Sequence, residues 1–161
     1  RELGAEQIRI WAGTKASGET SETEWQALAE EASEAAALAR DAGIRVCTEY
    51  HGGTLTDSPE SALRLLTACP LLRTYWQPLF DRTGQQERVI LEGLSGRLAH
   101  IHVFHWEKLS RLPLAEGKAR WRGYLEFVKR LPDNRCAYLE FVREDSVEQF
   151  LADAAVLKEL L

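Results

Sequence analysis

Four strand-like runs in this chain carry polar side chains that can bind a metal ion or exchange protons. In every run these side chains fall on one parity, and mainly apolar side chains fall on the other. The polar positions are Arg45, Cys47, Glu49 and His51; Arg73, Tyr75 and Gln77; His100 and His102; and Cys136, Tyr138 and Glu140. Because a strand alternates its side chains between two faces, this spacing gathers the polar residues on a single face. That face is the predicted functional site.

Two carboxylates of this polar face, Glu49 and Glu140, are suited to proton transfer. A proton next to a carbonyl can be removed near neutral pH only if the charge of the resulting enediolate is stabilised. A divalent cation stabilises it as a Lewis acid that binds the carbonyl and hydroxyl oxygens. Two carboxylates on opposite sides of the substrate can then remove and return the proton, each as base or acid. Glu49 and Glu140 end different strands and are the predicted catalytic pair.

The elements that position these residues form a repeated alternation of strands and helices. Strands are expected at about 8–13, 44–50, 72–77, 98–105 and 136–142. Helices are expected at about 21–42, 58–69, 85–95, 119–131 and 144–160. This spacing is typical of βαβ units, in which a parallel sheet is covered by helices. Since no linker or low-complexity segment interrupts the series, we expect a single α/β domain.

Two architectures fit this alternation, an open doubly wound sheet and a (β/α)8 TIM barrel. A doubly wound sheet buries both faces of its central strands under helices, which favours continuous apolar runs. The polar parity instead favours the lumen of a barrel that is polar toward its C-terminal mouth. Five βα units are too few for a barrel, which typically needs about 250 residues, and the chain begins at Arg1 without an initiating methionine. We expect residues 1–161 to be the C-terminal part of one barrel domain, covering about its last five βα units.

Composition narrows the range of partners. The 161 residues are 45% hydrophobic and 28% charged with a formal net charge of −5, as in an ordinary globular protein. Without a basic face we expect no nucleic-acid partner and no binding to an anionic membrane. The apolar runs are shorter than the roughly 18 residues of a membrane span, and the start lacks a signal-peptide pattern. These features predict a cytoplasmic protein. The three cysteines form no Cys-x-x-Cys pair, so free thiols are expected.

Four motifs follow one another along the chain, at residues 44–51, 98–103, 113–117 with Trp121, and 138–140. Their order and spacing resemble those of the xylose isomerase-like TIM barrels, the sugar phosphate isomerase/epimerase superfamily. This resemblance implies a sugar isomerase or epimerase that acts on a small sugar or sugar phosphate. It also implies a divalent cation, Mn²⁺ first and Mg²⁺, Co²⁺ or Zn²⁺ as alternatives, and a possible homodimer. The implied ligands at the barrel mouth are Glu49, Gln77, His102 and Glu140.

Gln77 departs from this resemblance, since the family pattern has aspartate at that position. A glutamine oxygen can still bind a hard cation, but it brings a dipole in place of a charge and weakens the site. The alternative function is therefore a non-catalytic or metal-free carbohydrate-binding barrel. The endonuclease-like branch of the superfamily needs a zinc cluster and a DNA-binding face, which neither the ligand count nor the charge supports.

Five further residues are candidates for substrate binding. His51 follows Glu49 by two positions, and His105 and Trp106 come soon after the strand that holds His102. Trp11 lies near a strand end, where an indole can stack on a sugar ring or pack in the core. Arg111 can bind a phosphate or hydroxyl groups, or remain a solvated loop charge.

Overall fold

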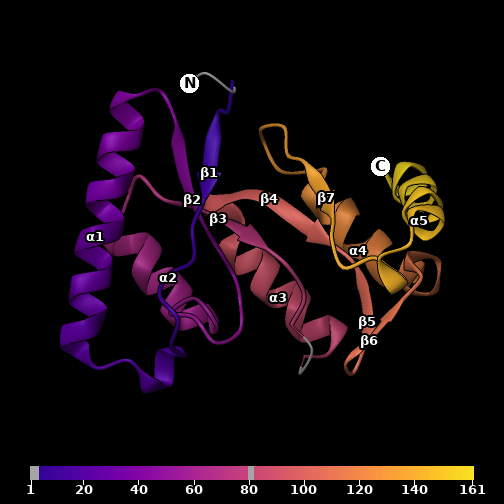
Figure 1. Ribbon diagram of the computed structural model, residues 1–161, viewed down its shortest axis with the longest axis horizontal. Helices are drawn as coiled ribbons and strands as arrows, with labels where there is room; N and C mark the ends of the chain where they lie inside the picture. Colours follow the sequence, from indigo (N-terminus) through magenta and orange to yellow (C-terminus); the bar gives the residue numbers. More distant parts are fainter. Residues whose placement is uncertain (1–3, 80–81) are drawn as a thin grey trace. The chain divides into compact units, whose positions relative to one another are not determined.

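The computed structural model describes residues 4–79 and 82–161, and it contains the expected alternation of strands and helices (Figure 1). Five strands form a parallel sheet in the order β1-β2-β3-β4-β7, so the strand order follows the chain. Their bounds are β1 Gln7–Arg9, β2 Arg45–Glu49, β3 Arg73–Trp76, β4 Leu98–Val103 and β7 Ala137–Leu139. The helices are α1 Glu22–Asp41, α2 Pro59–Ala68, α3 Gly84–Leu94, α4 Lys118–Val128 and α5 Val147–Leu160. A separate antiparallel hairpin joins β5 His105–Glu107 to β6 Ser110–Leu112.

The chain divides into two compact units. The N-terminal unit runs up to Gln77 and includes Gly96–Ala99, and the C-terminal unit contains Pro78–Ser95 and His100–Leu161. β4 therefore begins in the first unit and continues in the second.

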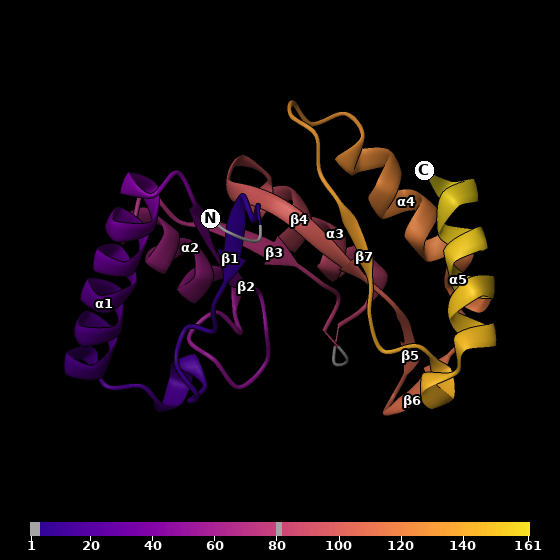
Figure 2. The ribbon, with the colours of Figure 1, turned by 45° about the horizontal axis from the view of Figure 1, so that its top comes forward.

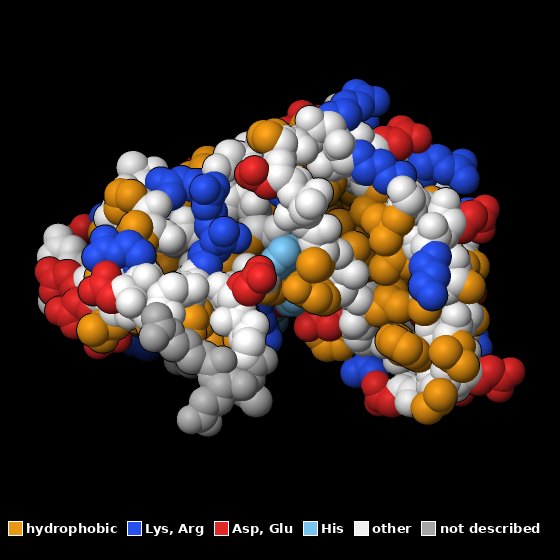
Figure 3. Space-filling view, turned by 90° about the horizontal axis from the view of Figure 1, so that it is seen from above, with side chains coloured by type: hydrophobic (Ala, Val, Ile, Leu, Met, Phe, Trp, Pro, Cys, Tyr) orange, Lys and Arg blue, Asp and Glu red, His pale blue; other side chains and the backbone are white. Residues whose placement is uncertain are grey.

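In the N-terminal unit, β1, β2 and β3 pair in parallel, with α1 and α2 on the same side of β1 and β2 (Figures 1 and 2). A capping box of Ser21 and Glu24 starts α1, and Gly43, with a φ of +75°, follows its end. The acidic side chains of α1 lie on the surface, in red at the left of Figure 3. The amide of Gln7 donates to the Tyr75 hydroxyl at 2.7 Å, so the polar parity is hydrogen-bonded inside this unit.

In the C-terminal unit, β4 pairs in parallel with β7, and α4 and α5 lie side by side (Figure 2). A buried polar network joins α3 to α4: the Arg120 guanidinium and the Tyr124 hydroxyl both donate to the Glu87 carboxylate. Burial, together with the hydrogen bond to Glu87, raises the pKa of Tyr124 to about 12. A buried carboxylate needs such partners, because an unpaired charge in the interior is costly.

The observed strands differ from the expected ones at three places. β1 ends at Arg9, and the chain continues to Trp11, whose indole stacks on His51. β7 ends at Leu139, because Phe141 has a φ of +52°, which an extended strand cannot accommodate. The hairpin β5–β6 was not expected from the sequence. Across the described residues, every helix is too short or too polar to pass through a bilayer.

Candidate active site

Glu49 ends β2 in the N-terminal unit, and its side chain is 3% exposed. The Arg9 guanidinium of β1 donates to Glu49 Oε2, which gives the buried carboxylate an oppositely charged partner. Parallel pairing with Tyr75 and a hydrogen bond from the Thr56 hydroxyl to the Glu49 carbonyl oxygen fix the backbone. The structure therefore holds Glu49 as a buried ion pair at the end of its strand.

Two predicted substrate-binding residues of the N-terminal unit contact each other. The rings of Trp11 and His51 are stacked, with their centroids 4.8 Å apart and their planes at 30°. His51 Nδ1 lies 2.6 Å from the Gly52 carbonyl oxygen, which can only accept, so Nδ1 carries a proton and Nε2 is free of this contact. Trp11 is 53% exposed. The stacked pair thus presents an indole face to solvent from the strand end that precedes α1.

Gln77, the predicted fourth metal ligand, follows β3 directly in the same unit. It is buried, like Trp76 before it. Its amide oxygen keeps ligand capacity, although it contributes no negative charge.

In the C-terminal unit, the structure brings together His102 of β4 and Glu140, which follows β7. Glu140 Oε2 lies 3.2 Å from His102 Nδ1. The Glu140 backbone N–H donates to the Val103 carbonyl oxygen at 3.1 Å, which extends the pairing of β4 with β7 up to this residue. Both side chains therefore leave adjacent parallel strands at neighbouring positions.

The contact between His102 and Glu140 is close, yet it is not a hydrogen bond. Glu140 Oε2 is buried and has no hydrogen-bond partner, although the distance to the imidazole is that of an ion pair. An interaction that is badly aligned contributes little, so this contact does not satisfy the carboxylate oxygen. A buried carboxylate oxygen without a donor, next to an imidazole nitrogen, is the arrangement of two ligands that share a cation. His102 and Glu140 therefore fit a divalent metal ion.

The hairpin β5–β6 carries Trp106 and Arg111 as directly paired cross-strand neighbours. Arg111 donates to Asp145 Oδ1 at 2.7 Å, and its guanidinium lies 5.8 Å from the Trp106 ring centroid and 5.4 Å from that of Phe141. Trp106 in turn packs edge-on against Phe104 and Phe141. These two predicted substrate contacts are thus part of an intramolecular cluster.

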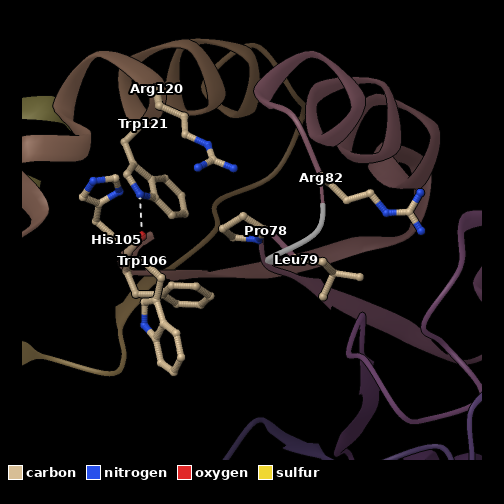
Figure 4. A pocket seen from close by; sticks show the side chains of 8 residues that line it. Pro78, Leu79, Arg82, His105, Trp106, Arg120 and Trp121 are labelled. Carbon is tan, nitrogen blue, oxygen red and sulfur yellow. Dashed lines mark hydrogen bonds between the residues drawn. The ribbon is translucent and has the colours of Figure 1, made fainter. Parts of the chain in front are cut away.

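His105 lines a small pocket of about 40 Å³ in the C-terminal unit (Figure 4). Its imidazole lies against Gly117, and burial lowers the pKa of His105, which favours the neutral ring. The Trp121 indole N–H donates to the Phe104 carbonyl oxygen at 2.7 Å and fixes the start of the hairpin against α4. In Figure 4 the Arg120 side chain lies beside Trp121, and the Arg82 guanidinium points away from it.

Sequence reasoning missed two ion pairs of these units. The first is the ion pair that Glu49 forms with Arg9 of β1. The one indication in the sequence was that Arg9 is a basic residue in the short strand that precedes α1. Arg120, held by Glu87, was also missed, because the two residues lie on different helices and no spacing rule connects them.

Comparison with known proteins identifies the family. The family model for xylose isomerase-like TIM barrels matches residues 1–160, so the chain belongs to this family and the expected fold is confirmed. The chain is 30% identical to an inosose dehydratase of Yersinia enterocolitica over 118 aligned residues. The aligned region covers 68% of this chain and 38% of the dehydratase. The chain therefore spans well under half the length of this relative.

Solved structures with the same fold include the probable 3-DHS dehydratase AsbF from Bacillus anthracis, with a TM-score of 0.78 and 20% identity over 97% of this chain and 64% of that one. A xylose isomerase-like TIM barrel protein from Mycobacterium smegmatis in complex with magnesium has a TM-score of 0.69 and 15% identity over 87% and 51%. D-Psicose 3-epimerase from Clostridium cellulolyticum H10, solved with D-tagatose, has a TM-score of 0.62 and 12% identity over 96% and 63%. At these identities the likeness shows the fold.

Proposed function

We propose that this chain supplies the C-terminal part of the active site of a sugar isomerase or epimerase, which removes a proton from a carbon next to a carbonyl. The observation that carries the proposal is the contact of His102 with the buried, unsatisfied oxygen of Glu140. Relatives named as dehydratases and an epimerase support chemistry on a polyhydroxylated carbonyl compound.

The proposed ligands of a divalent cation are Glu49, Gln77, His102 and Glu140. Glu49, His102 and Glu140 each offer one ligand atom, a carboxylate oxygen or an imidazole nitrogen. Mn²⁺ is our first choice, and the magnesium complex of a protein with the same fold supports a hard divalent ion. When bound, the cation would stabilise the negative charge that develops on the substrate oxygens.

The proton is moved by the two glutamates. In the proposed reaction one carboxylate takes the proton from the carbon next to the carbonyl, and the other returns a proton to the opposite face. The Trp11 indole, 53% exposed and supported by His51, offers a flat apolar surface for the C–H groups of a sugar. His105 and Trp106 are proposed to bind the far end of the substrate, a sugar or sugar phosphate. A homodimer remains a prediction.

Dehydration is the second candidate, and the Arg9 contact favours it. The Arg9 guanidinium donates to Glu49 Oε2, and a carboxylate already held in an ion pair is better suited to hold a cation than to donate a proton. Glu140 would then take the proton from carbon and pass the same proton to the hydroxyl group on the next carbon, which would leave as water. The similarity to an inosose dehydratase is in line with this outcome.

The test uses the full-length protein, with titration of Mn²⁺ by calorimetry and incubation of ketoses and inososes in D₂O. We expect stoichiometric Mn²⁺ binding that is lost in His102→Ala and in Glu140→Gln. The matched control is Glu144→Gln, which removes an exposed carboxylate from the following loop. Deuterium that enters the substrate next to its carbonyl reports the shared first step, and the product, an epimer or a dehydrated compound, separates the two candidates.

A carbohydrate-binding barrel without catalysis is the remaining alternative, and Gln77 is the reason to test it. Replacing Gln77 by Asp restores a charged ligand and is expected to raise the Mn²⁺ affinity. A large gain in affinity without deuterium incorporation in either protein would favour the binding protein. Wild type that binds no Mn²⁺ but exchanges deuterium would point to a metal-free enzyme.

A further inference from the structure

Arg111 joins the hairpin β5–β6 to the loop that follows β7. Its Nη1 donates to Asp145 Oδ1 at 2.7 Å and lies 3.4 Å from the Val142 carbonyl oxygen. The same guanidinium lies over the rings of Trp106 and Phe141. We call these contacts of Arg111 the arginine clamp. Because Asp145 is exposed, its ion pair alone contributes little, and the clamp depends on the combination of carboxylate, carbonyl and ring contacts.

The loop held by this clamp has an unusual backbone. Phe141, Glu144 and Asp145 have φ values of +52°, +59° and +50°, in the left-handed region that residues other than glycine rarely adopt. Such conformations persist only where tertiary contacts hold them. The Phe141 ring packs edge-on against Phe104 and Trp106, at centroid distances of 5.4 and 5.2 Å. The clamp and this aromatic packing join the loop to the hairpin β5–β6 and to Phe104, in addition to the loop's own backbone hydrogen bonds.

The position of Glu140 depends on this loop. On its N-terminal side, the sheet fixes the backbone through the hydrogen bond to the Val103 carbonyl oxygen. On its C-terminal side, the chain turns at once through the left-handed Phe141. A change in the path of Phe141 would therefore rotate Glu140 relative to His102, which lies 3.2 Å away.

We propose that Arg111 is a positioning residue that holds the Glu140 carboxylate against His102 through the clamp, and that it is not a substrate ligand. The importance of this position for catalysis rests on the proposed function. The position itself does not, because the clamp, the loop and the His102–Glu140 contact all belong to the C-terminal unit.

The test compares Arg111→Ala with Arg143→Ala in the full-length protein. Arg143 is an exposed arginine of the same loop, so both variants lose one positive charge. Nuclear magnetic resonance spectra are recorded on metal-free protein whose histidine rings are labelled with ¹⁵N. The chain contributes only four histidines to these spectra. We expect the His102 ring signals to shift in Arg111→Ala and to stay in place in Arg143→Ala. Amide hydrogen exchange in residues 141–146 should also accelerate in Arg111→Ala alone.

Mn²⁺ titration adds a second readout. Loss of a residue that orients a metal ligand typically lowers affinity about 10-fold or more, and this is the expected change for Arg111→Ala. Arg111→Lys keeps the charge but loses the planar fork, so an intermediate change is expected. Asp145→Asn removes the negative charge that pairs with Arg111 while it keeps a residue that tolerates the left-handed backbone, and it serves if Arg111→Ala does not fold.

The outcomes separate this inference from the proposed function. If the His102 signals and the amide exchange of the loop are the same in wild type and in the clamp variants, the inference is overturned, whatever Mn²⁺ does. If these signals shift in the clamp variants while wild type binds no Mn²⁺, the clamp is supported and the metal site is refuted. Equal Mn²⁺ affinity in wild type and in Arg111→Ala, when wild type binds, would overturn the positioning role.

Discussion

Gly117 occupies a position where the structure leaves no room for a side chain. It ends the short helix η3, Leu114–Gly117, directly before α4. A Cβ atom at Gly117 would lie 2.6 Å from His105 Nδ1 and 2.7 Å from His105 Cγ. The φ of Gly117 is −89°, which any residue can adopt, so space alone requires glycine here. Gly117→Ala is therefore a direct test of how tightly the His105 ring is held.

The size of the effect follows from these distances. An ordinary contact begins at 3.4 Å, so the ring or the backbone must move by most of an ångström to admit the methyl group. The imidazole is buried, and the space next to it is the small pocket that it lines, so the movement is confined to that pocket. Overpacking of this kind costs about 1–3 kcal/mol. Gly123→Ala is the matched control in α4, because its Cβ would meet no atom within 4 Å; there we expect a gain of about 0.5–1 kcal/mol from helix propensity.

Urea unfolding of the full-length protein measures both changes. A double-mutant cycle assigns the cost, because His105→Ala removes the ring that the new methyl group would contact. We expect Gly117→Ala to be destabilising with His105 present and close to neutral in the His105→Ala background. An equal cost in both backgrounds would refute the reasoning. If Gly117→Ala alone does not fold, recovery of folding in the double variant tests the same contact.

Three other predictions concern stability and reactivity. The pKa of Tyr124 is about 12 in the folded protein against 10.0 for the free side chain. The contribution of Tyr124 to the free energy of unfolding is thus complete below pH 10 and is lost as the pH rises toward 12. Tyr124→Phe should reduce this loss of stability in denaturation experiments at high pH. Thiol reagents should label exposed Cys136 in the native protein, and Cys47 and Cys69 only after unfolding; native labelling of Cys47, whose pKa burial raises to about 11, would contradict its burial. Ser21→Ala removes the capping box of α1 and should cost about 1 kcal/mol in thermal denaturation.

Much of the fold was predictable because buried parallel strands leave a strong pattern in the sequence. The register pairs Glu49 with Tyr75 and His102 with Tyr138, so the members of each pair share a face of the sheet, as the polar parity predicted. The hairpin β5–β6 was not predictable, because its turn at Lys108 contains neither glycine nor asparagine. Lys108 nevertheless adopts a φ of +54°, which the hairpin imposes on it.

The candidate site was predictable in its residue types and less so in their partners. Alternation along a strand determines which face a side chain takes, so spacing placed Glu49, His102 and Glu140 on one face, and the family resemblance implied their role as ligands. Ion-pair partners depend instead on strand tilt and side-chain length, and Arg9, which is level with Cys47 and not with Glu49, reaches Glu49 diagonally. Arg111 shows the same limit, because its contacts with Asp145 depend on a loop that no periodicity describes.

The order of strands in the sheet also has a consequence for synthesis on the ribosome. Each strand of the series β1-β2-β3-β4-β7 lies beside the one that precedes it in the series, with a helical connection between successive strands. Each strand that emerges from the ribosome can therefore pair with a strand that has already been synthesised. Such an order allows the sheet to grow during translation, from the N-terminal strands onward.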